Sequence, residues 1–279
     1  YLNVGDDGAD RSWAERLFHP WNGPLSTRFA ATFVLVAGVG VSLLTQRSRT
    51  AGDRAAIGED RWRLVRRGFA LFWSGFVLEW IWPGTILFFY GAYFMIAAGL
   101  FALRDRWVAL IGTGSAVAAA GVSWWELERR LDGVDTSWLH PEPDSPRNLL
   151  LRTFVDHTHP VLPWLAFLCA GMLIGRHLDV VRRRRFGLVA AGLAVVTLTA
   201  LVASLTPDSG RWEHLTSLNP FDRSVLYTAS ALGSAVAALG IVSWAAERWP
   251  ASPLVVALQR AGQLTLTLYV AHVLVFNLV

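Results

Sequence analysis

One histidine in this sequence lies in a turn-forming stretch where it could take part in catalysis. His19 belongs to the stretch FHPWNGP at 18–24, directly before a long apolar run. Glycine and proline at the end of this stretch favour a turn that would hold the imidazole at the mouth of a helix bundle. A neutral imidazole can remove the proton of an attacking amine or hydroxyl, or can itself be acylated and pass the group on. The residues leave both routes open. On residue chemistry alone, a surface turn with a solvated histidine is the simpler interpretation.

Other ionisable residues lie within or beside apolar runs. His272 lies inside the last run, where an ionisable group costs about 2.5–3.5 kcal/mol at a helix centre. We expect it to face the bundle interior, where it lines a channel or bonds to a neighbouring helix. Glu79 and Arg28 lie nearer the ends of runs, where snorkelling or pairing explains them. Arg28 also follows His19 closely enough to help bind a polar acceptor.

Two polar clusters have the composition of metal sites. The sequence DHTH at 156–159 could bind a metal or act in catalysis, but it precedes Pro160 at an expected helix start, which favours capping and solvation. Asp6, Asp7 and Asp10 lack the full oxygen set and the terminal glutamate of a calcium loop. We expect no metal.

The composition indicates the kind of structure that must position these residues. The 279 residues are 53% hydrophobic and only 16% charged, with a mean hydropathy of +0.39, too apolar for one soluble core. Many of the fourteen tryptophans lie where apolar runs end, as in interfacial belts. All basic residues are arginines that cluster between apolar runs, so a nucleic-acid partner is not expected. Cys169, the single cysteine, lies in an apolar run and is expected to pack there.

Eight apolar runs are long enough to cross a bilayer, which takes roughly 17–25 residues each. They predict an all-α, polytopic membrane bundle of about eight transmembrane helices, forming one domain over 1–279. The chain begins without methionine and stops inside an apolar run, so we expect both ends to be incomplete. The runs are 25–45, 67–83, 84–103, 107–125, 160–176, 186–206, 224–246 and 262–279.

The arginines predict the orientation of the bundle. They concentrate in the linkers 46–66, 104–106 and 176–185, which lie on one side if every run spans. The positive-inside rule makes that side cytoplasmic. The segment 1–24 and a long loop at 126–159 are then extracytoplasmic. The sequence therefore predicts a multi-pass protein of the cell membrane with His19 on the outer side.

Three short motifs carry a resemblance to a known family. The turn His19-x-Trp21-Asn22-Gly23, with the apolar helix that follows it, resembles the transmembrane acyltransferases related to heparan-alpha-glucosaminide N-acetyltransferase. The sequence NVG at 3–5 resembles that family's Asn-Tyr-Gly, and LYVAH at 268–272 resembles its Tyr-Val-Gly-His. The stretches 86–100 and 162–176 are similar to bacterial members. The spacing from Asn3 to His19 is longer than the family's usual one.

The resemblance implies transfer of an acetyl group from cytoplasmic acetyl-CoA to an amine or hydroxyl of an extracytoplasmic glycan or glycolipid. His19 would be the catalytic histidine, with Asn3 as its polar partner. The residues expected to bind the saccharide or glycolipid acceptor are Trp21, Asn22, Arg28 and His272. The acceptor's identity does not follow from these residues.

Arginines on the cytoplasmic side could hold the phosphates of CoA. Arg63, Arg66 and Arg67 begin an expected helix, and Arg182 to Arg185 begin another. Topogenic charge and contact with anionic membrane lipid are the default explanation of both clusters. No Gly-rich phosphate loop accompanies them. We assign Arg63, Arg66 and Arg67 to the donor as the alternative.

Two functions of other classes remain open. One is a transporter or exporter of a small solute or lipid, with His272 and Glu79 on its pathway. Broken helices and an inverted repeat would favour it, and the sequence shows no convincing repeat. The other is a structural membrane subunit. Small residues at 112–121 permit close helix contact within one chain or in a homodimer.

Overall fold

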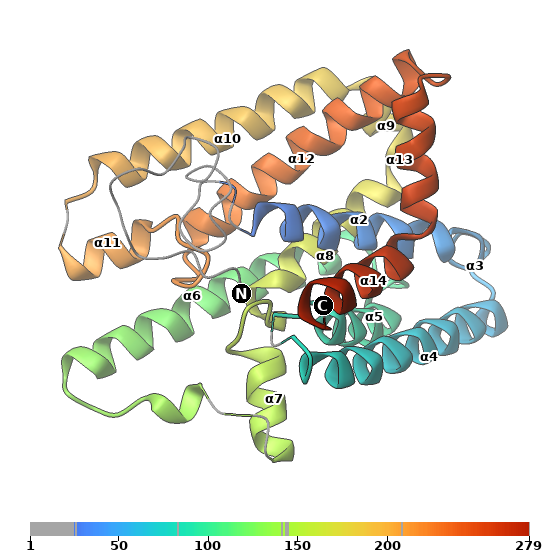
Figure 1. Cartoon of the computed structure of the whole chain (residues 1–279). Coiled ribbons are helices and arrows are strands. Elements are labelled where there is room, and N and C mark those ends of the chain that lie inside the picture. The colour runs from blue at the N-terminus through green and yellow to red at the C-terminus, as the bar shows by residue number, and fades with distance from the viewer. Residues whose placement is uncertain are drawn as a thin grey trace.

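The computed structural model describes residues 25, 27–82, 84–140, 142, 145–207 and 209–278. These residues form helices and connecting turns, with no strand in the described ranges (Figure 1). The helices are α2 (Arg28–Leu44), α3 (Gln46–Ala51), α4 (Arg54–Glu79), α5 (Leu87–Leu100), α6 (Asp105–Leu131), the 3-10 turn η1 (Ser137–Leu139), α7 (Pro146–Phe154), α8 (Val161–Arg176), α9 (Leu178–Arg183), α10 (Arg185–Leu205), α11 (Gly210–Thr216), α12 (Val225–Arg248), α13 (Pro253–Gln263) and α14 (Thr265–Leu278).

Several helices have the length and composition of membrane spans. Among the described residues α6, α10 and α12 qualify, and a fourth span is counted if α13 and α14, which meet at 82°, form one broken span. The helices α2, α5 and α8 are apolar but shorter. The chain is therefore all-helical with three to four candidate spans, while the count of about eight stays a prediction.

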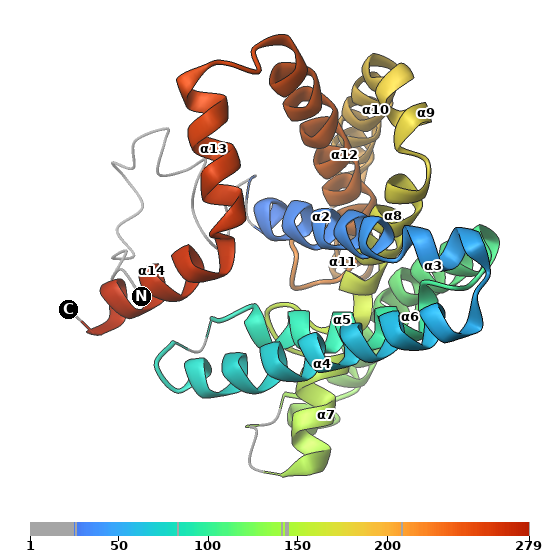
Figure 2. The same ribbon diagram turned by 90° about the vertical axis from the view of Figure 1, so that its right-hand side faces the viewer.

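The centre of the molecule is a crossing of α2 and α8 that depends on glycine. These two helices lie between the α10–α12 pair and the group of α4, α5 and α6 (Figures 1 and 2). A Cβ at Gly171 would lie 1.9 Å from the carbonyl oxygen of Leu35, and one at Gly38 would lie 2.2 Å from that of Leu168. The two backbones are thus in contact, as at small-residue interfaces in membranes. Cys169 is buried in the core beside this crossing, which confirms its packing role.

The three arginine-rich linkers meet at one end of the bundle, which we call the arginine end. Arg176, whose side chain is 2% exposed, donates to the carbonyl oxygens of Phe101 and Leu103, each at 2.9 Å, and to the Asp105 carboxylate at 2.5 Å. Arg49 lies within electrostatic range of both Arg176 and Asp105. The linkers after α2, α5 and α8 therefore share one end, as the sequence predicts.

Three expected boundaries are wrong. Arg63, Arg66 and Arg67 do not begin a helix, because Asp53 caps α4 by accepting from the Ala55 amide at 2.9 Å and the helix starts at Arg54. They lie on exposed positions inside α4.

The segment 126–159 is not one loop. The helix α6 continues to Leu131, and α7 begins at Pro146, where the Ser145 hydroxyl caps it. The last run is not one helix over 262–279 either, since α14 begins at Thr265 and Gly262 belongs to α13.

Candidate functional site

Ionisable side chains gather at the end of the bundle opposite the arginine end. They come from the last residue of α4, the C-terminal part of α6, the segment from η1 to the start of α8, and the residues before α12. We call this group the histidine cluster. Its members are Glu79, Glu126, His140, Arg152, Asp156, His157, His159 and Arg223.

His140 joins two carboxylates from different parts of the chain. Its Nε2 lies 2.7 Å from Glu126 Oε1 on α6, and its Nδ1 contacts the Asp156 carboxylate. Asp156 also accepts a hydrogen bond from Arg223, which lies directly before α12. A protonated imidazole can donate to both carboxylates at once. His140 and Asp156 thus link α6, the segment after α7, and α12.

The surroundings shift the pKa values of this linkage. Burial alone would lower the pKa of His140, but its hydrogen bonds to Glu126 and Asp156 raise it above the ordinary histidine value. Burial alone would raise the pKa of Asp156, but Arg223 and His140 hold it below its ordinary value. Both shifts favour the ionised pair.

A second, buried linkage joins α4 to α7. Glu79 accepts a hydrogen bond from Arg152, and each residue is only 7% exposed. The pairing expected for Glu79 is thereby confirmed. His157 lies beside this pair, with its Nε2 3.8 Å from Glu79 Oε1 and its ring stacked on Phe89 at a centroid distance of 5.6 Å.

Two histidines of the cluster are held neutral. Burial and the nearby Arg152 guanidinium lower the pKa of His157 to about 4. Burial, with His157 next to it, lowers the pKa of His159 to about 3. The His159 ring packs edge-on against Trp164 at 4.5 Å, and its carbonyl oxygen accepts from the Tyr93 hydroxyl at 2.5 Å. Both imidazoles are therefore uncharged but weak bases, because general-base catalysis works best when the pKa of the base lies near the working pH.

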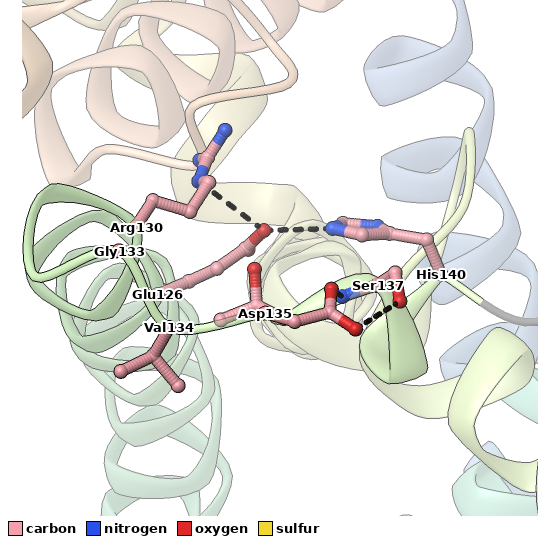
Figure 3. Close-up of a pocket in the computed structure, with 8 residues that line it drawn as sticks. Glu126, Arg130, Gly133, Val134, Asp135, Ser137 and His140 are labelled. Atoms are coloured by element: carbon pink, nitrogen blue, oxygen red, sulfur yellow. Dashed lines mark hydrogen bonds and ion pairs between the residues drawn. The ribbon is translucent and has the colours of Figure 1, made fainter.

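A pocket of about 490 Å³ opens beside the cluster at the C-terminal end of α6. Figure 3 shows the Glu126 carboxylate between Arg130 and His140, with the Asp135 and Ser137 side chains facing the same space. The Ser137 hydroxyl donates to Asp135 at 3.0 Å. The pocket offers carboxylate, guanidinium, imidazole and hydroxyl groups, which suit a polar ligand.

The structure describes only some of the predicted site residues. Asn3, His19, Trp21 and Asn22 lie outside the described residues, and their roles stay predictions. Arg28 donates to the hydroxyls of Ser230 at 2.9 Å and Ser234 at 3.3 Å on α12. Of the three arginines assigned to the donor, Arg63 donates to Asp60 at 2.8 Å. Arg63 and Arg66 lie in the half of α4 nearest the arginine end, and Arg67 lies at its midpoint.

His272 is exposed and contacts the rings of Trp82 and Tyr269 edge-on, and its expected role in lining a channel or bonding to a neighbouring helix stays a prediction. One expectation about the histidines is wrong. The DHTH sequence does not cap α8, because Pro160 is the cap residue and no side chain bonds to the helix start. In the described ranges, no three His, Cys, Asp or Glu side chains lie close enough to share a metal ion.

Comparisons with protein-family models, with curated proteins and with solved structures found no match to this chain. Any functional assignment therefore rests on the residues and geometry of this chain. Sequence reasoning missed Glu126, Arg152 and Arg223 as members of the histidine cluster. The sequence held one signal that could have indicated these residues: acidic residues and arginines both occur in segments expected on the same side of the membrane as the histidines.

The His140 linkage predicts a pH-dependent contribution to stability. Because the pKa of His140 is raised, its contribution is complete below about pH 6.5 and is lost as the pH rises through the raised value. Asp156, with its lowered pKa, contributes above its ordinary value of about 4. The gap in melting temperature between wild type and His140→Gln should be widest near pH 5.5 and narrower near pH 9. Since the ring is 45% exposed, the effect should stay below about 1 kcal/mol. A gap independent of pH would contradict the ionic linkage.

Proposed function

We propose that this chain is a membrane acyltransferase that moves an acetyl group from cytoplasmic acetyl-CoA to an amine or hydroxyl of an extracytoplasmic glycan or glycolipid. The observation that carries the proposal is the two-ended polarity of the bundle. Arginine-bearing linkers gather at one end, and the histidine cluster with its polar pocket lies at the other. Phosphates of a donor suit the first end, and the pocket lined by Glu126, Ser137 and His140 suits a polar acceptor at the second. In this proposal all eight apolar runs cross the membrane.

In the proposed reaction, the imidazole of His19 takes up the acceptor's proton and then releases it. The acceptor's nitrogen or oxygen attacks the thioester carbonyl, its proton passes to His19, and the proton then goes to the departing CoA thiolate. In the two-step version the acetyl group is first carried by His19. The Asn3 amide would donate to the developing oxyanion. Trp21, Asn22, Arg28 and His272 would bind the acceptor, and Arg63, Arg66 and Arg67 would contact the donor phosphates.

Labelled acetyl-CoA tests this assignment on the purified full chain in detergent. Transfer of label to an added saccharide acceptor, or release of free CoA, should disappear in His19→Ala. The matched control is His177→Ala, since His177 lies at the arginine end and contacts Asp105 at 2.7 Å. This control should keep wild-type transfer. If His19→Ala transfers label as well as His177→Ala does, the proposed mechanism is wrong.

A transporter or exporter of a small solute or lipid is the second candidate. The 82° break between α13 and α14 favours it, because broken helices form the binding sites of many transporters. Thermal stabilisation by CoA separates the two functions, since CoA at about 100 times its Kd would add about 2.7 kcal/mol of stability. No shift at millimolar CoA, with solute uptake by proteoliposomes, would favour the transporter.

A further inference from the structure

The hydroxyl of Thr158 lies between two imidazoles of the histidine cluster. Its Oγ1 is 3.0 Å from Nδ1 of His157 and 2.9 Å from Nδ1 of His159. Aromatic side chains hold both rings in place. His157 stacks on Phe89 at a centroid distance of 5.6 Å, and His159 packs edge-on against Trp164 at 4.5 Å. The hydroxyl and the two ring nitrogens therefore meet in a fixed arrangement.

The single proton of the Thr158 hydroxyl cannot be donated to both nitrogens. A hydroxyl donates one hydrogen bond and accepts two, and a neutral imidazole carries its proton on only one nitrogen. Both histidines are neutral at pH 7, since their pKa values are about 4 and about 3. If both Nδ1 atoms carried protons, the hydroxyl proton would have no acceptor in the described part of the chain. The arrangement that uses this proton makes His157 and His159 opposite tautomers.

The Glu79 carboxylate determines which histidine takes which form. Its Oε1 lies 3.8 Å from Nε2 of His157, and the nearby Arg152 guanidinium is paired with the same carboxylate. An ionised carboxylate only accepts hydrogen bonds, so it favours a protonated nitrogen opposite it. His157 then carries its proton on Nε2, its Nδ1 accepts from Thr158, and the Thr158 oxygen accepts from Nδ1 of His159. The remaining nitrogen, Nε2 of His159, keeps an unused lone pair.

Nε2 of His159 is open to a ligand. It has no hydrogen-bond partner among the described residues, and His159 is half-buried rather than enclosed. Within the described ranges, the enclosed side-chain nitrogens and oxygens that lack a partner all belong to arginines. A molecule that enters the cluster can therefore reach this lone pair.

We propose that Nε2 of His159 binds the hydrogen of a neutral hydroxyl or amide group of a ligand, and that hydrogen bonds running from Glu79 through His157 and Thr158 hold it in the accepting state. His157 and Thr158 are positioning residues, because they act through His159. The imidazole of His159 stays uncharged, so the site favours a donor that keeps its hydrogen. The proposal depends neither on acetyl transfer nor on His19.

Nitrogen-15 NMR of the full chain in detergent, with labelled histidine, tests the tautomers. The chemical shift separates protonated from unprotonated ring nitrogens, and His157→Gln and His159→Gln assign the signals. Near pH 7, Nε2 should be protonated in His157 and unprotonated in His159. Thr158→Val removes the hydroxyl but keeps the shape, so it should abolish the fixed tautomer of His159, and Thr158→Ser should restore it. The control Tyr93→Phe should leave both tautomers unchanged, because the Tyr93 hydroxyl donates to the His159 carbonyl oxygen and not to the ring.

Diethyl pyrocarbonate, which acylates accessible unprotonated imidazole nitrogens, tests access to the site at about pH 6. Peptide mass spectrometry should show His159 modified several-fold faster than His140, whose two ring nitrogens both contact carboxylates. A protonated Nε2 in wild-type His159, or an unchanged tautomer in Thr158→Val, would overturn the proposed relay. An unmodified His159 would show that its Nε2 is closed to ligands and would overturn the binding site.

Discussion

Replacing Arg152 by methionine is expected to lower the free energy of unfolding by about 3–5 kcal/mol, because the Glu79 carboxylate is left buried without its partner. Both residues are 7% exposed, so water cannot take the place of the guanidinium. His157, at 3.8 Å from the same carboxylate, is not an equivalent partner, because burial is the larger cause of its lowered pKa and remains when Arg152 is lost. The measurement is reversible unfolding of the purified protein in mixed micelles.

Two further variants separate the charge effect from the loss of packing. The double variant Glu79→Gln with Arg152→Met removes both charges and should recover most of the lost stability. The same substitution in an exposed pair, Arg211→Met, should change little, although Arg211 contacts Glu128 at 2.7 and 2.9 Å. If the double variant is no more stable than Arg152→Met, the penalty comes from packing rather than from an unpaired charge.

Adding one methyl group at Gly171 should destabilise the protein by about 3 kcal/mol, the upper part of the range for overpacked cores. The new Cβ would lie 1.9 Å from the carbonyl oxygen of Leu35, and no rotamer change can relieve a clash between two backbones. The helices α2 and α8 would have to move apart. Unfolding of Gly171→Ala in the same micelles measures the cost.

The chain offers a matched control in α2 itself. Gly40 lies two residues from Gly38, yet a Cβ there would meet nothing within 4 Å. Gly40→Ala should therefore be neutral or stabilise the helix by up to about 1 kcal/mol. Equal destabilisation by Gly40→Ala and Gly171→Ala would mean that the close crossing of α2 and α8 does not set the effect.

The apolar runs predicted the bounds of the described helices well where the whole helix is apolar. The runs 186–206 and 224–246 match α10 and α12 closely, because lipid-facing helices must be apolar along their whole length. The run 67–83 missed the first part of α4, which extends back to Arg54 because Asp53 caps it. A hydropathy pattern does not detect a polar first turn that a cap stabilises.

The histidine cluster could be predicted only in outline. The arginine pattern placed His140, His157 and His159 at one end of the bundle, and the fold brings them together there. Their partners could not be found in the same way, because the contacts join residues far apart in the chain. Glu79 and Arg152 are 73 residues apart, and Asp156 and Arg223 are 67 apart. Pairings of this kind depend on how the helices pack. For His19 and Asn3, the sequence remains the sole basis of the prediction.

The shortness of the central helices has a consequence for the membrane around them. The 14 residues of α5 extend about 21 Å and the 16 residues of α8 about 24 Å, less than the roughly 30 Å of a hydrocarbon core. If these helices cross a bilayer, the polar groups at their ends lie below the level of the headgroups, because both helices are largely buried among their neighbours and lipid does not surround them. The apolar layer would then be thinnest at the middle of the protein, and there a group passed between the two aqueous phases would have the shortest distance to travel.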